Sequence, residues 1–99
     1  MIKRIVRLTV KDAAAKEAFQ EIYRSRNPYK NGVAGCREVK VMQDVNDDDV
    51  YYTVSIWDSN DDLEAYRNSD YFAKTWPMVK AQLSKRAEAF SMTETEITV

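Results

Sequence analysis

The chain has 99 residues, of which 44% are hydrophobic and 31% charged, and its formal net charge is −1. This size and composition predict one globular domain spanning residues 1–99. A single cysteine excludes a disulfide framework, and no apolar run approaches the roughly 20 residues that span a bilayer. The N-terminal MIKRIVRLTV also lacks the long apolar segment of a signal peptide. We therefore expect a cytoplasmic protein with no membrane partner.

Charge is distributed unevenly along the chain. Residues 1–40 contain ten Lys/Arg and four Asp/Glu, whereas residues 41–99 contain five and twelve. Such asymmetry can indicate a basic surface for nucleic acid. The near-zero total and the lack of a polybasic run favour instead basic and acidic strands that lie side by side in one sheet. No nucleic-acid partner is expected.

The first half of the chain predicts strand, helix and strand. Ile2, Val6, Leu8 and Val10 fall on one face of a period-two pattern, with Arg4 as the exception on that face. Asp12 predicts the N-cap of a helix that ends near Arg26, because Asn27 precedes Pro28. A loop with both glycines follows. The next predicted elements are a strand at 36–43, a hairpin connection at 44–49 and a strand at 50–57.

The second half predicts a helix in two segments and a last strand. Ser59 or Asn60 is expected to cap the first segment, and Ser69 the second. An apolar stripe at helical spacing marks the second segment, where Pro77 is expected to kink or restart the helix. A strand is expected within 87–99.

This order, β-α-β-β-α-β, is that of the ferredoxin-like α+β fold, with a four-stranded antiparallel sheet and helices on one face. The other face is expected to carry Ile5, Trp57 and one of Tyr51 and Tyr52. A contiguous apolar patch there marks an interaction site. The simplest partner is a second copy, which gives a homodimer in which two sheets cover each other.

One stretch resembles the signature of a known family. The pattern W-x-S-x-x-x-L-x-A-x-x-x-S-x-x-F, from Trp57 to Phe72, is similar to that of the antibiotic biosynthesis monooxygenase family, and GVAGCREVKV resembles its glycine-led entry into the second strand. The resemblance covers nearly the whole chain. It implies a dimeric α+β barrel and, in some members, a small-molecule pocket between helices and sheet. Characterised relatives include cofactor-free monooxygenases that make quinones from phenols, quinol-handling proteins and haem-degrading enzymes.

The chain departs from the family at several positions. Ser55 stands where many members carry glutamate, and Tyr66 and Tyr71 stand where many carry histidine. Trp76 matches the position of the axial histidine in the haem-degrading branch, and the chain contains no histidine at all. Haem bound in that way is therefore not expected, and no cofactor is predicted.

The missing histidines also exclude Ser-His triads, Cys-His pairs and His-rich metal sites. Cys36 is expected to be a small buried hydrophobe. The DVNDDD segment lacks the glycine and the final glutamate of a calcium loop, so a solvated hairpin is expected. No metal site is predicted.

Aromatic side chains are the remaining candidates for a site. A flat apolar substrate pocket could be walled by four of them. These are Tyr52 and Trp57 of the strand at 50–57, and Phe72 and Trp76 of the helix that follows. The alternative is that they are core side chains.

The catalytic candidates are Arg7 as an anion stabiliser and Tyr66 and Tyr71 as proton relays. They predict a cofactor-independent monooxygenase that oxidises a small hydroxylated aromatic, of phenol or quinol type, with dioxygen. A non-catalytic binding or sensing module for a small aromatic ligand is an open alternative. An RNA-binding domain of the same topology is another, although VYYTVSIW lacks the glycine and basic residue of its motif.

Overall fold

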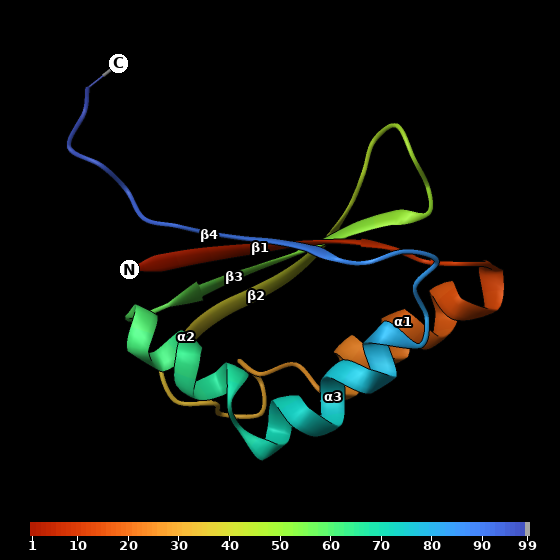
Figure 1. Ribbon diagram of the computed structural model, residues 1–99, viewed down its shortest axis with the longest axis horizontal. Helices are drawn as coiled ribbons and strands as arrows, with labels where there is room; N and C mark the ends of the chain where they lie inside the picture. The colour runs from red at the N-terminus through yellow and green to blue at the C-terminus, as the bar shows by residue number, and fades with distance from the viewer. Residues whose placement is uncertain (99) are drawn as a thin grey trace.

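The computed structural model describes residues 1–98 and has the element order β-α-β-β-α-α-β. The strands are β1 (Ile2–Thr9), β2 (Cys36–Gln43), β3 (Val50–Trp57) and β4 (Glu88–Met92). The helices are α1 (Ala13–Ser25), α2 (Asn60–Arg67) and α3 (Asp70–Lys80). The strands form one antiparallel sheet in the order β2-β3-β1-β4, and all three helices lie on one of its faces (Figure 1). The predicted ferredoxin-like fold is confirmed, with its second helix divided into two.

Side-chain caps set where the helices begin. Asp12 accepts a hydrogen bond from the backbone N–H of Ala15 (2.7 Å), and Ser59 and Ser69 cap α2 and α3 in the same way. The predicted caps are confirmed. The predicted restart of the helix at Pro77 does not occur, because α3 runs continuously from Asp70 to Lys80. Pro77 lies on the exposed side of the helix, where water can satisfy the carbonyl that loses its helical donor.

The strand register decides which face each side chain occupies. Leu8 of β1 lies opposite Tyr51 of β3, and both are buried under the helices. Since side chains alternate along a strand, Trp57 also faces the helices. The prediction that Trp57 lies on the open face is therefore wrong. Of Tyr51 and Tyr52, the one on the open face is Tyr52.

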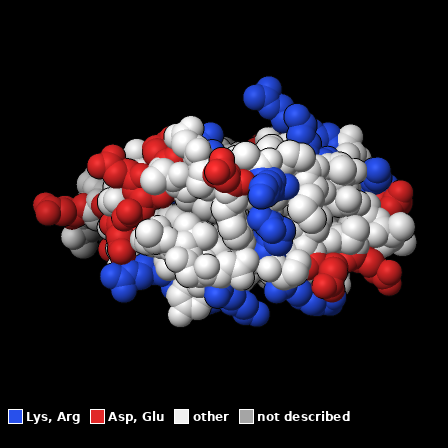
Figure 2. All heavy atoms as spheres, turned by 90° about the horizontal axis from the view of Figure 1, so that it is seen from below, with Lys and Arg blue, Asp and Glu red and all other residues white. Residues whose placement is uncertain are grey.

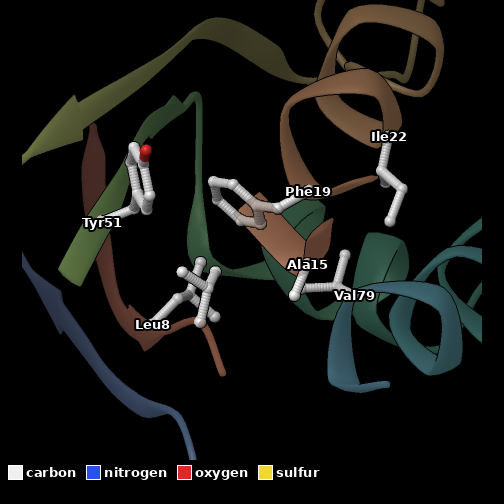
Figure 3. Close-up of a cluster of buried hydrophobic side chains, with 7 residues drawn as sticks. Leu8, Ala15, Phe19, Ile22, Tyr51 and Val79 are labelled. Carbon is white, nitrogen blue, oxygen red and sulfur yellow. The ribbon is translucent and has the colours of Figure 1, made fainter. Parts of the chain in front are cut away.

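A compact core fills the space between one half of the sheet and two helices. Leu8 and Tyr51 from the sheet meet Phe19 and Ile22 of α1, together with Val79 of α3 (Figure 3). The rings of Phe19 and Tyr51 lie 5.0 Å apart. Each fully buried side chain of this size stabilises the fold by about 1.5–3 kcal/mol. The core uses the C-terminal half of β1, which leaves the N-terminal half for other contacts.

Three salt bridges join the basic first part of the chain to its acidic second part. Arg7 lies 3.8 Å from Glu88, Lys16 lies 3.7 Å from Asp49, and Arg37 pairs with Asp58. On the helix-covered face, acidic side chains gather mainly toward the end where α2 lies, and basic side chains are spread elsewhere (Figure 2). The charges thus follow sheet and surface pairing rather than one continuous basic patch.

Within residues 1–98, no helix has the length and apolar character needed to cross a membrane.

Candidate functional site

A cavity of about 830 Å³ lies between the sheet and the helices, beside the core. Its walls come from all four strands, all three helices and the α1–β2 and α3–β4 loops. Its aromatic and larger aliphatic lining consists of Val6, Tyr23, Val39, Trp57, Tyr66, Phe72, Trp76 and Leu83. A cavity of this volume with this lining is typical of a small-molecule site.

Four aromatic rings form a continuous wall. The ring centroids of Trp57 and Tyr66 are 4.9 Å apart, and those of Tyr66 and Phe72 are 5.2 Å apart in an edge-on arrangement. Phe72 and Trp76 are stacked at 6.0 Å with an interplanar angle of 5°. These two follow each other at i and i+4 on α3, so they share one face of the helix. The wall offers the faces and edges of aromatic rings to an aromatic ligand.

Trp57 is the fixed part of this wall. It is buried, and its indole Nε1 donates a hydrogen bond to Ser55 Oγ at 2.9 Å. Both side chains point to the helix side from the same strand, two residues apart. Ser55 therefore holds the indole ring in one orientation at the cavity.

Arg4 supplies a charge within the cavity. It lies between Ser55 of β3 and Ser91 of β4 in the sheet register, and its Nη1 donates to Ser91 Oγ at 3.2 Å. Burial lowers the pKa of Arg4, Arg67 nearby lowers it further, and Glu64 opposes both. A guanidinium remains charged despite such a shift. The sequence analysis did not place Arg4 in the site. Its position on the otherwise apolar face of the first strand could have indicated that this arginine lies under the helices.

Tyr66 faces the cavity as a neutral phenol. Burial raises the pKa of Tyr66 to about 12, with Tyr71 and Cys36 contributing, while Arg4 and Arg26 act in the opposite direction. At neutral pH its hydroxyl is therefore a hydrogen-bond donor and not a base.

Two of the predicted site residues lie elsewhere. Arg7 and Tyr52 are neighbours across the sheet on the face opposite the helices. Arg7 pairs with Glu88, and the Tyr52 hydroxyl donates to Asp44 Oδ2 at 2.8 Å. Strand alternation places them on the other side of the sheet from Trp57, so neither lines this cavity. Arg7 and Tyr52 therefore do not share one site with Trp57, although the sequence had predicted that they would.

Tyr71 is close to the aromatic wall but is held outside the cavity. Its ring lies 6.1 Å from that of Tyr66 and 4.6 Å from the guanidinium carbon of Arg26. Its hydroxyl accepts a hydrogen bond from Asn31 Nδ2 at 2.7 Å. The structure thus brings together Trp57, Tyr66, Phe72 and Trp76 from the predicted set, and not Tyr71.

The other candidates carry no site. Cys36 is half-buried, and burial raises the pKa of its thiol, as suits the expected small hydrophobe. Asp44 and Asp47 accept hydrogen bonds from the backbone N–H groups of Asn46 and Asp49, so their carboxylates serve the hairpin. Residues 1–98 contain no group of three or more His, Cys, Asp or Glu side chains that could hold a metal ion.

The fold and the cavity together define a class: small ferredoxin-like domains with a cavity between sheet and helices. The family model for the antibiotic biosynthesis monooxygenase domain matches residues 1–76, and the chain belongs to this family. A search of curated protein sequences found no match.

Solved structures share the fold at low sequence identity. A conserved protein from Methanosarcina mazei Go1 has a TM-score of 0.86 at 19% identity, with 95% of this chain and 92% of that chain covered. SnoaB, a cofactor-independent oxygenase from Streptomyces nogalater crystallised in a mutant form, has a TM-score of 0.80 at 16% identity, with 97% and 94% covered. PA3566 from Pseudomonas aeruginosa has a TM-score of 0.76 at 21% identity, with 95% and 93% covered.

Proposed function

We propose that the protein is a cofactor-independent monooxygenase that oxidises a small hydroxylated aromatic with dioxygen. One observation carries the proposal: a wall of four aromatic rings and a half-buried guanidinium, that of Arg4, line the same cavity. Membership of the monooxygenase family and the fold shared with SnoaB support it by analogy.

The chemistry needs only the substrate and dioxygen. An ionised phenol passes one electron to dioxygen, and the resulting aryloxyl radical and superoxide combine to form a bond between oxygen and a ring carbon. The peroxide anion formed in this way gains a proton and becomes a hydroperoxide. The hydroperoxide then loses its terminal OH and the hydrogen of the same ring carbon as water, which leaves a carbonyl, so the phenol gains one oxygen atom and becomes a quinone. The second oxygen atom leaves in the water. The substrate supplies all the electrons, and the protein positions the reactants and stabilises charge.

The cavity residues divide these tasks. Arg4 takes the anion-stabilising role expected of Arg7, because it is the arginine of β1 that faces the cavity. Tyr66, a neutral phenol at neutral pH, donates a proton to the peroxide oxygen that leaves as water and regains one when the ring carbon loses its hydrogen. The aromatic wall orients the ring and excludes water.

Oxygen uptake with a panel of quinols and polycyclic phenols tests the proposal. Wild-type protein should consume oxygen and form quinone without added metal or flavin. Arg4→Gln and Tyr66→Phe should each lower kcat about 10- to 100-fold. Arg24→Gln, a change on the exposed side of α1, is the matched control. If no substrate is consumed while tryptophan fluorescence still responds to these compounds, the protein is a binding module instead.

We also propose a homodimer formed through the open face of the sheet. The register places Ile5, Val54, Ile56, Phe90 and Met92 on this face. Phe90 and Met92 are 52% and 43% exposed in the single chain. An open face with apolar side chains on three neighbouring strands is covered most simply by a second copy related by a two-fold axis.

A further inference from the structure

We infer that the cavity binds its ligand as a preformed anion, a planar aromatic whose negatively charged group lies against Arg4. The inference rests on the proposed function in one respect, namely that this cavity is the ligand site. It adds the charge state in which the ligand enters.

The charged lining of the cavity is entirely basic. Five basic side chains line it: Arg4, Arg67, Lys80, Lys85 and Arg86. No aspartate or glutamate does so among the residues that the structure describes. Glu64, outside the lining, pairs with Arg67 at 3.0 Å. Within residues 1–98 the other four cations have no carboxylate within 4.0 Å.

Arg4 is the strongest part of this argument. Its guanidinium has five N–H donors, and the hydroxyl of Ser91 accepts from one of them. It lies on the helix-facing side of a central strand, between Ser55 and Ser91. Burying a charge without a directly paired countercharge is unfavourable, and Glu64, which acts on Arg4 from a distance, pairs with Arg67. An anionic ligand group would supply a direct partner and accept two of the remaining N–H groups in the bidentate geometry that arginine favours.

The loop between α3 and β4 brings two more cations to the cavity. Backbone hydrogen bonds from Lys11 N to Gln82 O (2.9 Å) and from Ser84 N to Thr9 O (2.9 Å) fix the start of this loop to the end of β1. Lys85 and Arg86 follow directly and are exposed. They can attract an anion to the cavity from solution, while Arg4 holds it inside.

The lining has no group that could remove a proton from a neutral phenol. It contains no carboxylate among the described residues, the chain has no histidine, and burial raises the pKa values of Tyr23 and Tyr66. An acidic ligand that is already ionised in solution therefore suits the cavity better than a neutral phenol. Two sources share this chemistry: an aromatic carboxylate, and a phenol or enol made acidic by a conjugated ring carbonyl.

Calorimetric binding under nitrogen, without turnover, tests the inference. The probes are 2-naphthoate and 2-naphthamide, which have the same ring and differ in charge, and 2-hydroxy-1,4-naphthoquinone, an acidic enol. Wild-type protein should bind naphthoate at least about tenfold more tightly than naphthamide, and high salt should reduce this preference. Comparison of naphthoate with the hydroxynaphthoquinone shows which anionic source fits better.

Substitution then locates the effect. Arg4→Gln should weaken naphthoate binding about tenfold or more and change naphthamide binding less than about twofold, whereas Arg24→Gln should alter neither. If Arg4→Gln does not fold, Lys85→Gln/Arg86→Gln in the exposed loop should still weaken naphthoate binding several-fold. Equal affinity for naphthoate and naphthamide, equal weakening of both, or no binding of either would overturn the inference. Failure of oxygen uptake alone would leave the inference standing, because no step here requires turnover.

Discussion

The guanidinium of Arg26 lies 4.6 Å from the ring centroid of Tyr71, and its Nε donates to Thr75 Oγ1 at 2.6 Å. The Thr75 hydroxyl in turn donates to the carbonyl of Tyr71 at 2.8 Å. Thr75 is buried. These contacts join the C-terminal end of α1 to α3 behind the aromatic wall, so they fix the helix that carries Phe72 and Trp76.

Arg26→Ala should therefore destabilise the protein more than Tyr71→Phe does. The first removes a cation–π contact and a hydrogen bond to a buried hydroxyl, at a cost of about 2–3 kcal/mol. The second removes the hydroxyl bonded to Asn31 and keeps the ring, at a cost of about 0.5–1.5 kcal/mol. Urea unfolding of both variants measures the difference. Loss of turnover in a stable Tyr71→Phe variant would return this tyrosine to the catalytic set.

Gly35→Ala should destabilise the chain more than Gly32→Ala. Both glycines have positive φ, +79° and +74°, so an alanine costs about 1 kcal/mol at either from the backbone alone. At Gly35 a Cβ would also overlap the side chain of Asp62, whereas at Gly32 it would meet nothing within 4 Å. We expect a total of about 2 kcal/mol or more at Gly35. Equal unfolding midpoints for the two variants would show that the contact with Asp62 relaxes freely.

Alkaline pH should destabilise the wild-type protein partly through Tyr66. Folding raises the pKa of this phenol to about 12 from about 10 in an unfolded chain. The neutral form is favoured in the folded state, so the stabilisation is fully present below about pH 10 and is lost as the pH rises toward 12. Burial of Tyr23 acts in the same direction.

Tyr66→Phe removes one of these two groups, so its stability should fall less steeply over this range. Urea unfolding at a series of pH values provides the measurement. Parallel curves for wild type and variant would contradict the raised pKa.

Phe90→Glu should convert a homodimer to a monomer. Phe90 lies opposite Ile5 on the open face, and a carboxylate there would have to be buried between the two sheets. Light scattering after size exclusion gives the mass. Met78→Glu, on the exposed side of α3, is the control and should leave the mass unchanged. A monomeric wild-type protein at about 100 μM would contradict the proposed dimer.

Local signals accounted for most of the fold. Asp12, Ser59 and Ser69 could be placed as caps because a helix N-terminus needs a side-chain acceptor within a few residues. Period-two alternation also sorted the strand residues into two faces. It did not decide which face meets the helices, because Ile5 and Leu8 are both apolar and only helix packing distinguishes them.

The site was less predictable because it, too, depends on contacts between distant parts of the chain. The aromatic wall follows helical spacing and could be anticipated, whereas the row of Ser55, Arg4 and Ser91 joins three strands whose pairing is a long-range property. Lys85 and Arg86 line the cavity because distant backbone hydrogen bonds fix the start of their loop. No local pattern encodes that placement.

Strand β1 serves the core with one half and the cavity with the other. Leu8 and Val10 are buried in the core, while Arg4 and Val6 line the cavity further back along the same face. A substitution at position 4 can therefore alter the lining of the cavity while Leu8 and Val10 keep the core intact. Position 6 is more constrained, because Val6 lines the cavity and also packs against the core.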